Sequence, residues 1–166
     1  MNTVIETILS RRSIRDYRPE VVTDEEIELI LNAGLFAPSA MNHQSWHFTV
    51  IQNQQVIEKI VEKLGRNPFY NAKTLILAFG QESCIEPVID PALAMENMFL
   101  AAHSIGIGTC WVNCVKTIFQ SPEGKAFQKE LGVSEDYNCI GSMIMGYPNE
   151  VSVAKPRKEG TVNWVK

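Results

Sequence analysis

The chain has 166 residues, of which 45% are hydrophobic and 20% are charged, a balance typical of one soluble globular domain. Its formal net charge of -4 argues against a nucleic-acid partner, because nucleic-acid-binding domains usually carry a basic face. The apolar runs at 75–79 and 98–102 are too short to span a bilayer, and the N-terminal residues lack the pattern of a signal peptide. We therefore expect one domain over residues 1–166, working in the cytoplasm without a membrane or nucleic-acid partner.

Helical and strand-like patterns interleave along the chain. In chain order, they predict a helix over 3–9, a helix over 24–34, a strand over 46–51, a helix over 56–64, a strand over 74–79, a helix over 90–105, a strand over 109–112, a helix over 122–131 and a strand over 139–145. Thr3 and Thr23 begin capping-box sequences, and Asp90 stands as a cap before a proline. The 90–105 helix is apolar nearly all round, which is typical of a buried central helix. The interleaved order predicts an α+β or α/β layered domain.

The segment 10–15 places three arginines and two serine hydroxyls directly after the first predicted helix. A guanidinium binds two phosphate oxygens at once and a serine hydroxyl adds a further short bond, so the pattern suits a phosphate monoester as ligand. Taken alone, however, the segment favours the plainer interpretation that Arg11 and Arg12 only offset the negative end of the helix dipole, because arginine is common at helix C-termini.

The loop over residues 37–46 is rich in hydroxyl and amide groups and connects a predicted helix to a predicted strand. Such a loop can offer hydrogen bonds to a flat heterocycle with alternating donors and acceptors. The alternative is a plain connection in which Ser39 and Asn42 bond their own backbone.

The end of the chain combines a basic segment at 155–158 with an apolar segment at 162–165. The basic segment is either a third cationic cluster or a solvated tail. Chain ends usually fray unless they dock, so we expect the apolar segment to pack against a neighbour, with the other subunit of a dimer as the candidate.

The cysteines and histidines give no metal or acid–base signature. Four cysteines in a chain without export signals are expected to be reduced. Cys110 and Cys114 are four residues apart, but no second pair or nearby histidine completes a zinc site, so buried thiols are expected and no metal. His43, His47 and His103 have no identified partner group that would make any of them a proton donor.

Four segments, in this order and spacing, resemble the nitroreductase-like FMN-dependent flavoproteins. Residues 11–15 are similar to the Arg-x-Ser-x-Arg/Lys motif of that family, and residues 38–48 resemble its Pro-Ser-x-x-Asn-x-Gln-Pro-Trp signature. Residues 95–111 look like its long central helix and the following turn, and 146–148 with the basic tail resemble its closing segment. The resemblance covers essentially the whole chain. It implies a nitroreductase-like fold with a central, mostly antiparallel sheet flanked by helices, and a C-terminal tail exchanged with the dimer partner.

The resemblance also implies FMN sites at the interface of a homodimer. The segment 11–15 and the basic tail would hold the phosphate and ribityl chain, the 38–44 loop would reach the flavin of the partner subunit, and the backbone of 111–114 would lie beside the reactive flavin nitrogen. The implied cofactor-binding residues are Arg11, Arg12, Ser13, Arg15, Pro38, Ser39, Ala40, Met41, Asn42, Gln44, Trp111, Val112, Asn113, Lys155 and Arg157. No side chain is assigned as catalytic, because the chemistry would belong to the flavin.

The implied activity is a ping-pong oxidoreductase in which NAD(P)H reduces FMN and leaves before a nitroaromatic, quinone or related acceptor enters. No Gly-x-Gly-x-x-Gly follows a strand, so a separate dinucleotide domain is not expected. Two departures from the family pattern are Ser45, in place of the usual proline, and Asn113-Cys114, where many members have Glu-Gly. The alternatives are a flavin-binding or sensory module without turnover and an anion-binding interaction domain without flavin.

Overall fold

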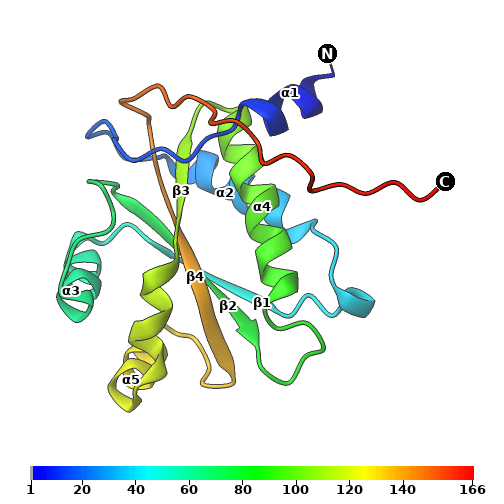
Figure 1. Ribbon diagram of the computed structural model, residues 1–166. Helices are drawn as coiled ribbons and strands as arrows, with labels where there is room; N and C mark the ends of the chain where they lie inside the picture. The colour runs from blue at the N-terminus through cyan, green and yellow to red at the C-terminus, as the bar shows by residue number, and fades with distance from the viewer. Residues whose placement is uncertain (1) are drawn as a thin grey trace.

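A four-stranded antiparallel sheet, with helices on both faces, organises the computed structural model, which describes residues 2–166 (Figure 1). In chain order, the elements are α1 (Thr3–Ser10), α2 (Asp24–Leu35), η1 (Ala40–Asn42), β1 (Trp46–Ile51), α3 (Gln54–Leu64), β2 (Thr74–Gln81), α4 (Ile89–Ser104), β3 (Gly108–Val112), η2 (Asn113–Gln120), α5 (Pro122–Glu130) and β4 (Tyr137–Gly146). The predicted helices and strands are confirmed to within two residues at each end. The 3-10 helices η1 and η2 were not predicted.

The strand order is β1-β2-β4-β3, with every neighbouring pair antiparallel. Strand β2 is buried from Thr74 to Gly80, which confirms the prediction of a strand covered on both faces. Its side chains alternate between two cores, because successive residues of a strand point to opposite faces. Leu75 and Leu77 pack with α3, η2 and α5, whereas Ile76 and Ala78 pack with α2 and α4.

Helix α4 is the buried central helix that the sequence predicts. It packs against α2 and touches all four strands. The two helices approach closely at Gly34, where an added Cβ would lie only 2.3 Å from Cε of Met98. Among the described residues, no helix is long and apolar enough to cross a membrane.

Two helix caps differ from the prediction. Asn2, not Thr3, caps α1, because the Asn2 side chain accepts a hydrogen bond from Val4 N at 2.9 Å. Helix α4 begins one residue before Asp90, whose carboxylate bonds to a distant loop instead of its own helix. The capping box at Thr23 is confirmed, with its side chain and that of Glu26 each accepting from the other's backbone N–H.

Residues 11–18 are tied first to the free edge of β3 and then to residues 147–148, which follow β4. Ile14 N donates to Thr109 O at 2.9 Å, and Ser13 forms a parallel bridge with Thr109. The ring of Tyr17 is buried beside Gly146, and its hydroxyl donates to Ile14 O, so the segment is held from both sides. Burial raises the pKa of Tyr17.

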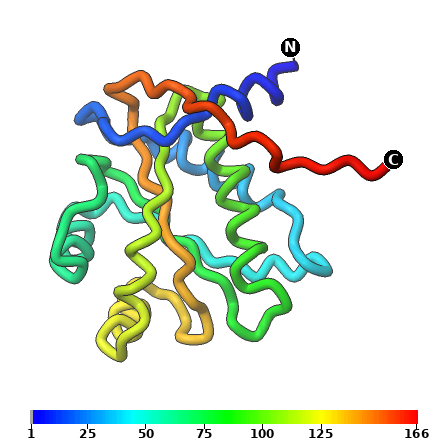
Figure 2. The backbone as a smooth tube through the Cα atoms, in the orientation of Figure 1, coloured from blue at the N-terminus to red at the C-terminus, as the bar shows by residue number. Residues whose placement is uncertain are grey.

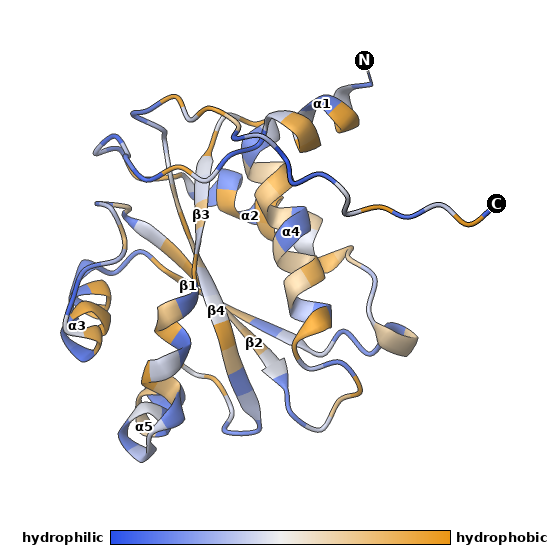
Figure 3. Cartoon of the chain, viewed as in Figure 1, coloured by the Kyte–Doolittle hydropathy of each residue, from blue (hydrophilic) through white to orange (hydrophobic). Residues whose placement is uncertain are grey.

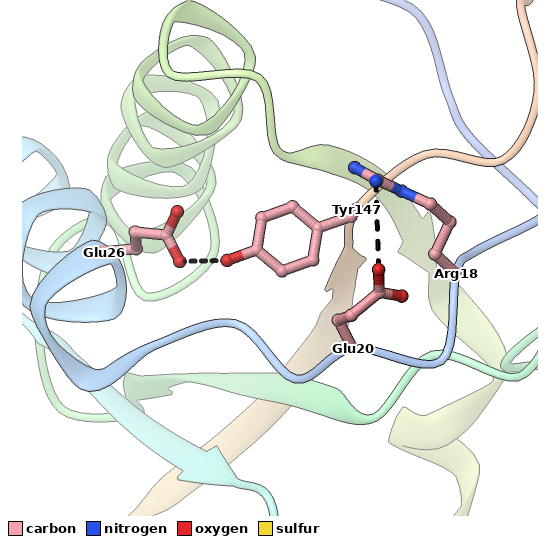
Figure 4. Close-up of polar contacts among 4 residues, drawn as sticks. All are labelled: Arg18, Glu20, Glu26 and Tyr147. Atoms are coloured by element: carbon pink, nitrogen blue, oxygen red, sulfur yellow. Dashed lines mark hydrogen bonds and ion pairs between the residues drawn. The ribbon is translucent and has the colours of Figure 1, made fainter.

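A polar cluster joins this segment to α2 and to the end of β4 (Figure 4). The Tyr147 hydroxyl donates to Oε2 of Glu26 at 2.7 Å, and the guanidinium of Arg18 lies 5.3 Å from the centroid of the Tyr147 ring. Arg18 also pairs with Glu20 at 3.8 Å. Burial tends to raise the pKa of Glu26, but the hydrogen bonds from the Thr23 backbone and Tyr147 outweigh it and lower that pKa.

Beyond Pro148 the chain is an extended tail that runs past α1 and then leaves the body of the molecule (Figures 1 and 2). Apolar residues are exposed along this tail and on α1, where no residue is buried (Figure 3). The strongly exposed apolar residues of the tail are Val151, Val153, Val162, Trp164 and Val165. Within one chain, these side chains remain uncovered.

Candidate functional site

A hollow of about 610 Å³ lies where β3 passes into η2, and we call it the Arg15 pocket. It is lined by three segments that are distant in sequence. The lining residues are Arg15, Arg66, Asn67, Pro68, Tyr70, Cys110, Trp111, Val112, Asn113, Cys114 and Thr117. Arg15 and the 111–113 stretch, which the family resemblance assigns to one cofactor site, are therefore brought together by the fold.

Arg15 reaches this pocket because the two residues before it are paired with β3 at Thr109. Ile14 faces the core, where it packs against Gly108 so closely that an added Cβ there would lie 2.9 Å from its Cγ1. The backbone N–H of Arg15 donates to Oε1 of Glu150 at 2.5 Å, which ties the segment to the start of the tail. The Arg15 side chain remains exposed, as a group that binds a charged ligand must be.

The other two arginines of the motif lie elsewhere in the single chain. The guanidinium of Arg11 is 5.9 Å from the centroid of the Phe99 ring on α4. Arg12 donates to Leu9 O at 2.7 Å and to Arg11 O at 2.5 Å, at the C-terminal end of α1. Arg12 thus occupies the position that the helix-dipole alternative describes, and Ser13 is half-buried beside β3.

Trp111 forms a wall of the Arg15 pocket and depends on a glycine beneath it. The register of β2 and β4 shifts next to Gly141, whose φ is +152°. An added Cβ at Gly141 would lie 2.3 Å from Cζ2 of Trp111, so only glycine lets the indole lie this close to β4. Val112, next along β3, is buried, and its carbonyl accepts from the Ser142 hydroxyl at 3.2 Å.

Sequence reasoning missed Arg66, Asn67 and Tyr70 as pocket residues. They follow Gly65, which ends α3 in the left-handed conformation. Tyr70 also has a positive φ, of +50°, which is uncommon for a residue with a bulky side chain. An arginine directly after a helix-ending glycine is the signal that could have found this segment, but the sequence alone does not show that it faces Arg15.

The 39–45 loop contains the other predicted cluster, and its backbone is strained. Met41, Asn42 and Gln44 have φ values of +51°, +57° and +50°. Each left-handed residue other than glycine costs about 1–3 kcal/mol, less for asparagine, and such strain clusters at functional sites. Gln44 N donates to Oγ of Ser39 at 3.0 Å, as the plain-connection alternative expects for a serine in this loop.

The 39–45 loop and the Arg15 pocket do not meet within one chain. The loop lies beside the start of α4, on the far side of that helix from α3 (Figure 1), and it contributes none of the pocket lining. Pro38 and Met41 are exposed. Lys155 and Arg157 are exposed on the tail and likewise lie outside the lining of this pocket. The structure therefore assembles one half of the predicted site and presents the other half separately.

The cysteines and histidines form no metal site. Among residues 2–166, no group of three or more histidine, cysteine, aspartate or glutamate side chains could hold a metal ion. The cysteines are free, and burial raises the pKa of Cys139 to about 12. His103 pairs with the hydroxyl of Ser10 at 2.8 Å. Burial lowers the pKa of His103, and the nearby charges of Arg11 and Arg12 lower it further.

Comparisons with known proteins agree with one another. Residues 8–82 and 62–147 match the profile described as the Nitroreductase family. The fold superposes with a TM-score of 0.93 on a crystal structure of a nitroreductase with bound FMN from Bacteroides fragilis, at 33% identity over 100% of both chains. The chain is also 32% identical to a protein of Archaeoglobus fulgidus provisionally named NADH dehydrogenase/NAD(P)H nitroreductase, over 90% of this chain and 88% of the relative. It is 27% identical to an FMN reductase [NAD(P)H] of Bacillus subtilis, over 95% of this chain and 70% of the relative.

Proposed function

Because the chain belongs to the nitroreductase family, we propose that it is an FMN-dependent oxidoreductase that takes electrons from NAD(P)H. Its acceptors are nitroaromatic, quinone or related small molecules, reduced in a ping-pong sequence at one open site. The observation that carries this proposal is the Arg15 pocket, which unites a basic segment, a loop and the end of β3.

The residues of the Arg15 pocket fit FMN. Arg15 and Arg66 supply positive charge for a phosphate monoester, which an arginine binds through two parallel hydrogen bonds. The exposed ring of Tyr70 supplies aromatic surface for a flat ring system. The volume of about 610 Å³ falls within the range of about 300–1,000 Å³ that is typical of cofactor and ligand sites.

The pocket is open, as a site that serves two substrates in turn must be. When bound, FMN supplies the hydride and electron chemistry, which no protein side chain provides. Arg15 and Arg66 would hold the phosphate, and backbone N–H groups at the start of η2 would offer hydrogen bonds to the ring. We assign no side chain as nucleophile or general acid.

We further propose a homodimer in which the 39–45 loop completes the site of the partner subunit. The loop and the Arg15 pocket lie apart within one chain, so both can contact one flavin only if two chains contribute. The exposed apolar residues of α1 and of the tail supply surface for this interface, and tail exchange would bring Lys155 and Arg157 to the neighbouring phosphate.

The test of the activity is a visible spectrum of the purified protein after incubation with FMN, followed by addition of NADH or NADPH without oxygen. We expect a flavin absorption band that bleaches with at least one of the two reductants and returns when a quinone is added. A protein that remains colourless with excess FMN would overturn the proposal. Bound flavin that neither reductant bleaches would favour a binding or sensory module.

The dimer has a separate test. A chain ending at Glu150 removes the exposed apolar tail and both of its proposed cationic ligands. We expect sedimentation to show a dimer for the full chain, and a weakened or lost dimer with lower FMN affinity for the shortened chain. Tight FMN binding by a full-length protein that sediments as a monomer would contradict the shared site.

A further inference from the structure

The carboxylate of Asp90 is buried and bonds to a loop that is distant from it in sequence. Asp90 is in the first turn of α4 and only 2% exposed. Its Oδ1 accepts from Ala40 N at 3.0 Å, and its Oδ2 accepts from the Ser45 hydroxyl at 3.1 Å. Burial of a carboxylate is tolerated only when hydrogen bonds compensate it, and here both of these bonds come from the 39–45 loop.

The two donors stand on either side of the strained part of that loop. Met41, Asn42 and Gln44, all with positive φ, lie between Ala40 and Ser45. Such conformations persist only where the surroundings enforce them. Ser45 is itself 1% exposed, and its carbonyl accepts from the N–H at the end of β2 at 2.8 Å. One side chain on the central helix therefore connects both ends of the strained segment to the core.

We propose that Asp90 is a positioning residue of the cofactor site. Acting through Ala40 and Ser45, it holds the 41–44 segment in the conformation in which the loop contacts the flavin. This inference rests on the proposed function. It also gives a physical role to Ser45, which stands where the family signature has proline: a proline has no hydroxyl, and the serine supplies the second donor to the buried carboxylate.

The test compares Asp90→Ala, Asp90→Asn and Ser45→Ala with the full-length protein. Alanine removes both hydrogen bonds. Asparagine is the conservative change, because its carbonyl can accept from Ala40 N while its amide donates to the Ser45 hydroxyl. Val133→Ala is the control, because it creates a small cavity in the other core, away from this loop. For each protein we would measure FMN affinity by fluorescence quenching, the absorption spectrum of the flavin at saturation, and thermal unfolding.

We expect Asp90→Ala to raise the FMN Kd about tenfold or more, because two charge-assisted hydrogen bonds are lost, and to change the shape of the flavin absorption band. Ser45→Ala should raise the Kd less, and Asp90→Asn should stay within about threefold of the wild type, since both hydrogen bonds can be kept. Val133→Ala should lower the unfolding temperature but leave the Kd and spectrum unchanged. A purely structural role for Asp90 would instead make affinity follow stability in all four variants.

Three results would overturn the inference. The first is a folded Asp90→Ala variant with the wild-type Kd and spectrum, which leaves the proposed function standing. The second is an Asp90→Asn variant as weak as Asp90→Ala, which would point to charge and not to the hydrogen bonds. The third applies if Asp90→Ala does not fold, in which case Ser45→Ala alone decides. An unchanged FMN Kd in Ser45→Ala would then overturn the inference. A wild-type protein that binds no FMN would remove the proposed function together with this inference.

Discussion

The Arg15 pocket and the 39–45 loop are two halves of one proposed site, and they are held in different ways. The pocket is built on regular structure, because the segment that carries its arginine is paired with the edge of β3, and its tryptophan lies on β3 and packs against Gly141 of β4. The loop is irregular and strained, and a buried carboxylate on α4 connects it to the core. A change in the pocket should therefore act through packing or charge, whereas a change in the loop should act through conformation.

The largest effect is expected from Gly141→Ala, which disturbs the pocket and leaves the loop intact. The new methyl group would overlap the Trp111 ring, and φ at this position is unfavourable for alanine. Overpacking of this kind together with backbone strain should lower the free energy of unfolding by about 3 kcal/mol, measured by urea denaturation. The quenching of tryptophan fluorescence that accompanies FMN binding should also become weaker. A variant as stable as the wild type would mean that the indole is not held against β4.

Arg15→Ala should separate binding from stability. Loss of a guanidinium that binds a phosphate should weaken FMN binding by about 2 kcal/mol, or roughly thirtyfold in Kd, while the free energy of unfolding of the apoprotein changes little because the side chain is exposed. Arg18→Ala is the matched control, because it removes the same charge three residues further on and outside the pocket lining. Equal losses of affinity in the two variants would indicate a general charge effect instead of a phosphate contact.

Tyr147→Phe tests a contact outside both halves, since Tyr147 connects the end of β4 to the start of α2. The lost hydrogen bond to Glu26 should lower the free energy of unfolding by about 1 kcal/mol at neutral pH. The pKa of Glu26 is lowered in the folded state, so its contribution is present above the ordinary glutamate pKa and is lost as pH falls through the lowered value. The difference between wild type and variant should therefore shrink in acid. A difference that is constant from neutral pH into acid would contradict this origin.

The smallest effect is expected from Met41→Gly, which relieves strain in the loop. Glycine adopts a φ of +51° without steric cost, and the Met41 side chain is 81% exposed, so little packing is lost in a single chain. We expect the free energy of unfolding of the apoprotein to rise by about 0.5–1 kcal/mol while FMN affinity falls, because the loop becomes less ordered. Leu29→Gly, at an exposed site inside a helix, should only destabilise the protein. A gain in both stability and affinity would show that the strain serves no purpose in binding.

Local patterns were sufficient for the elements of the fold. Apolar periodicity and the capping box at Thr23 depend on neighbouring residues, so they can be read without knowledge of what each element packs against. No element was predicted between residues 112 and 122, although Val115, Ile118 and Phe119 of η2 stand at helical spacing and are buried. The sequence therefore contains a helical signal in this segment.

The sequence by itself determined the order of helices and strands, the central helix, and the two segments that carry the proposed phosphate and flavin contacts. Only the tertiary structure decided which side chains join them. Arg66 lines the same pocket as Arg15, Gly141 accommodates Trp111, and Asp90 bonds to a loop fifty residues before it. The physical reason is that a cap or a periodicity is satisfied within one or two helical turns. The partner of a buried carboxylate, or the neighbour of a glycine on a strand, depends on how distant segments pack.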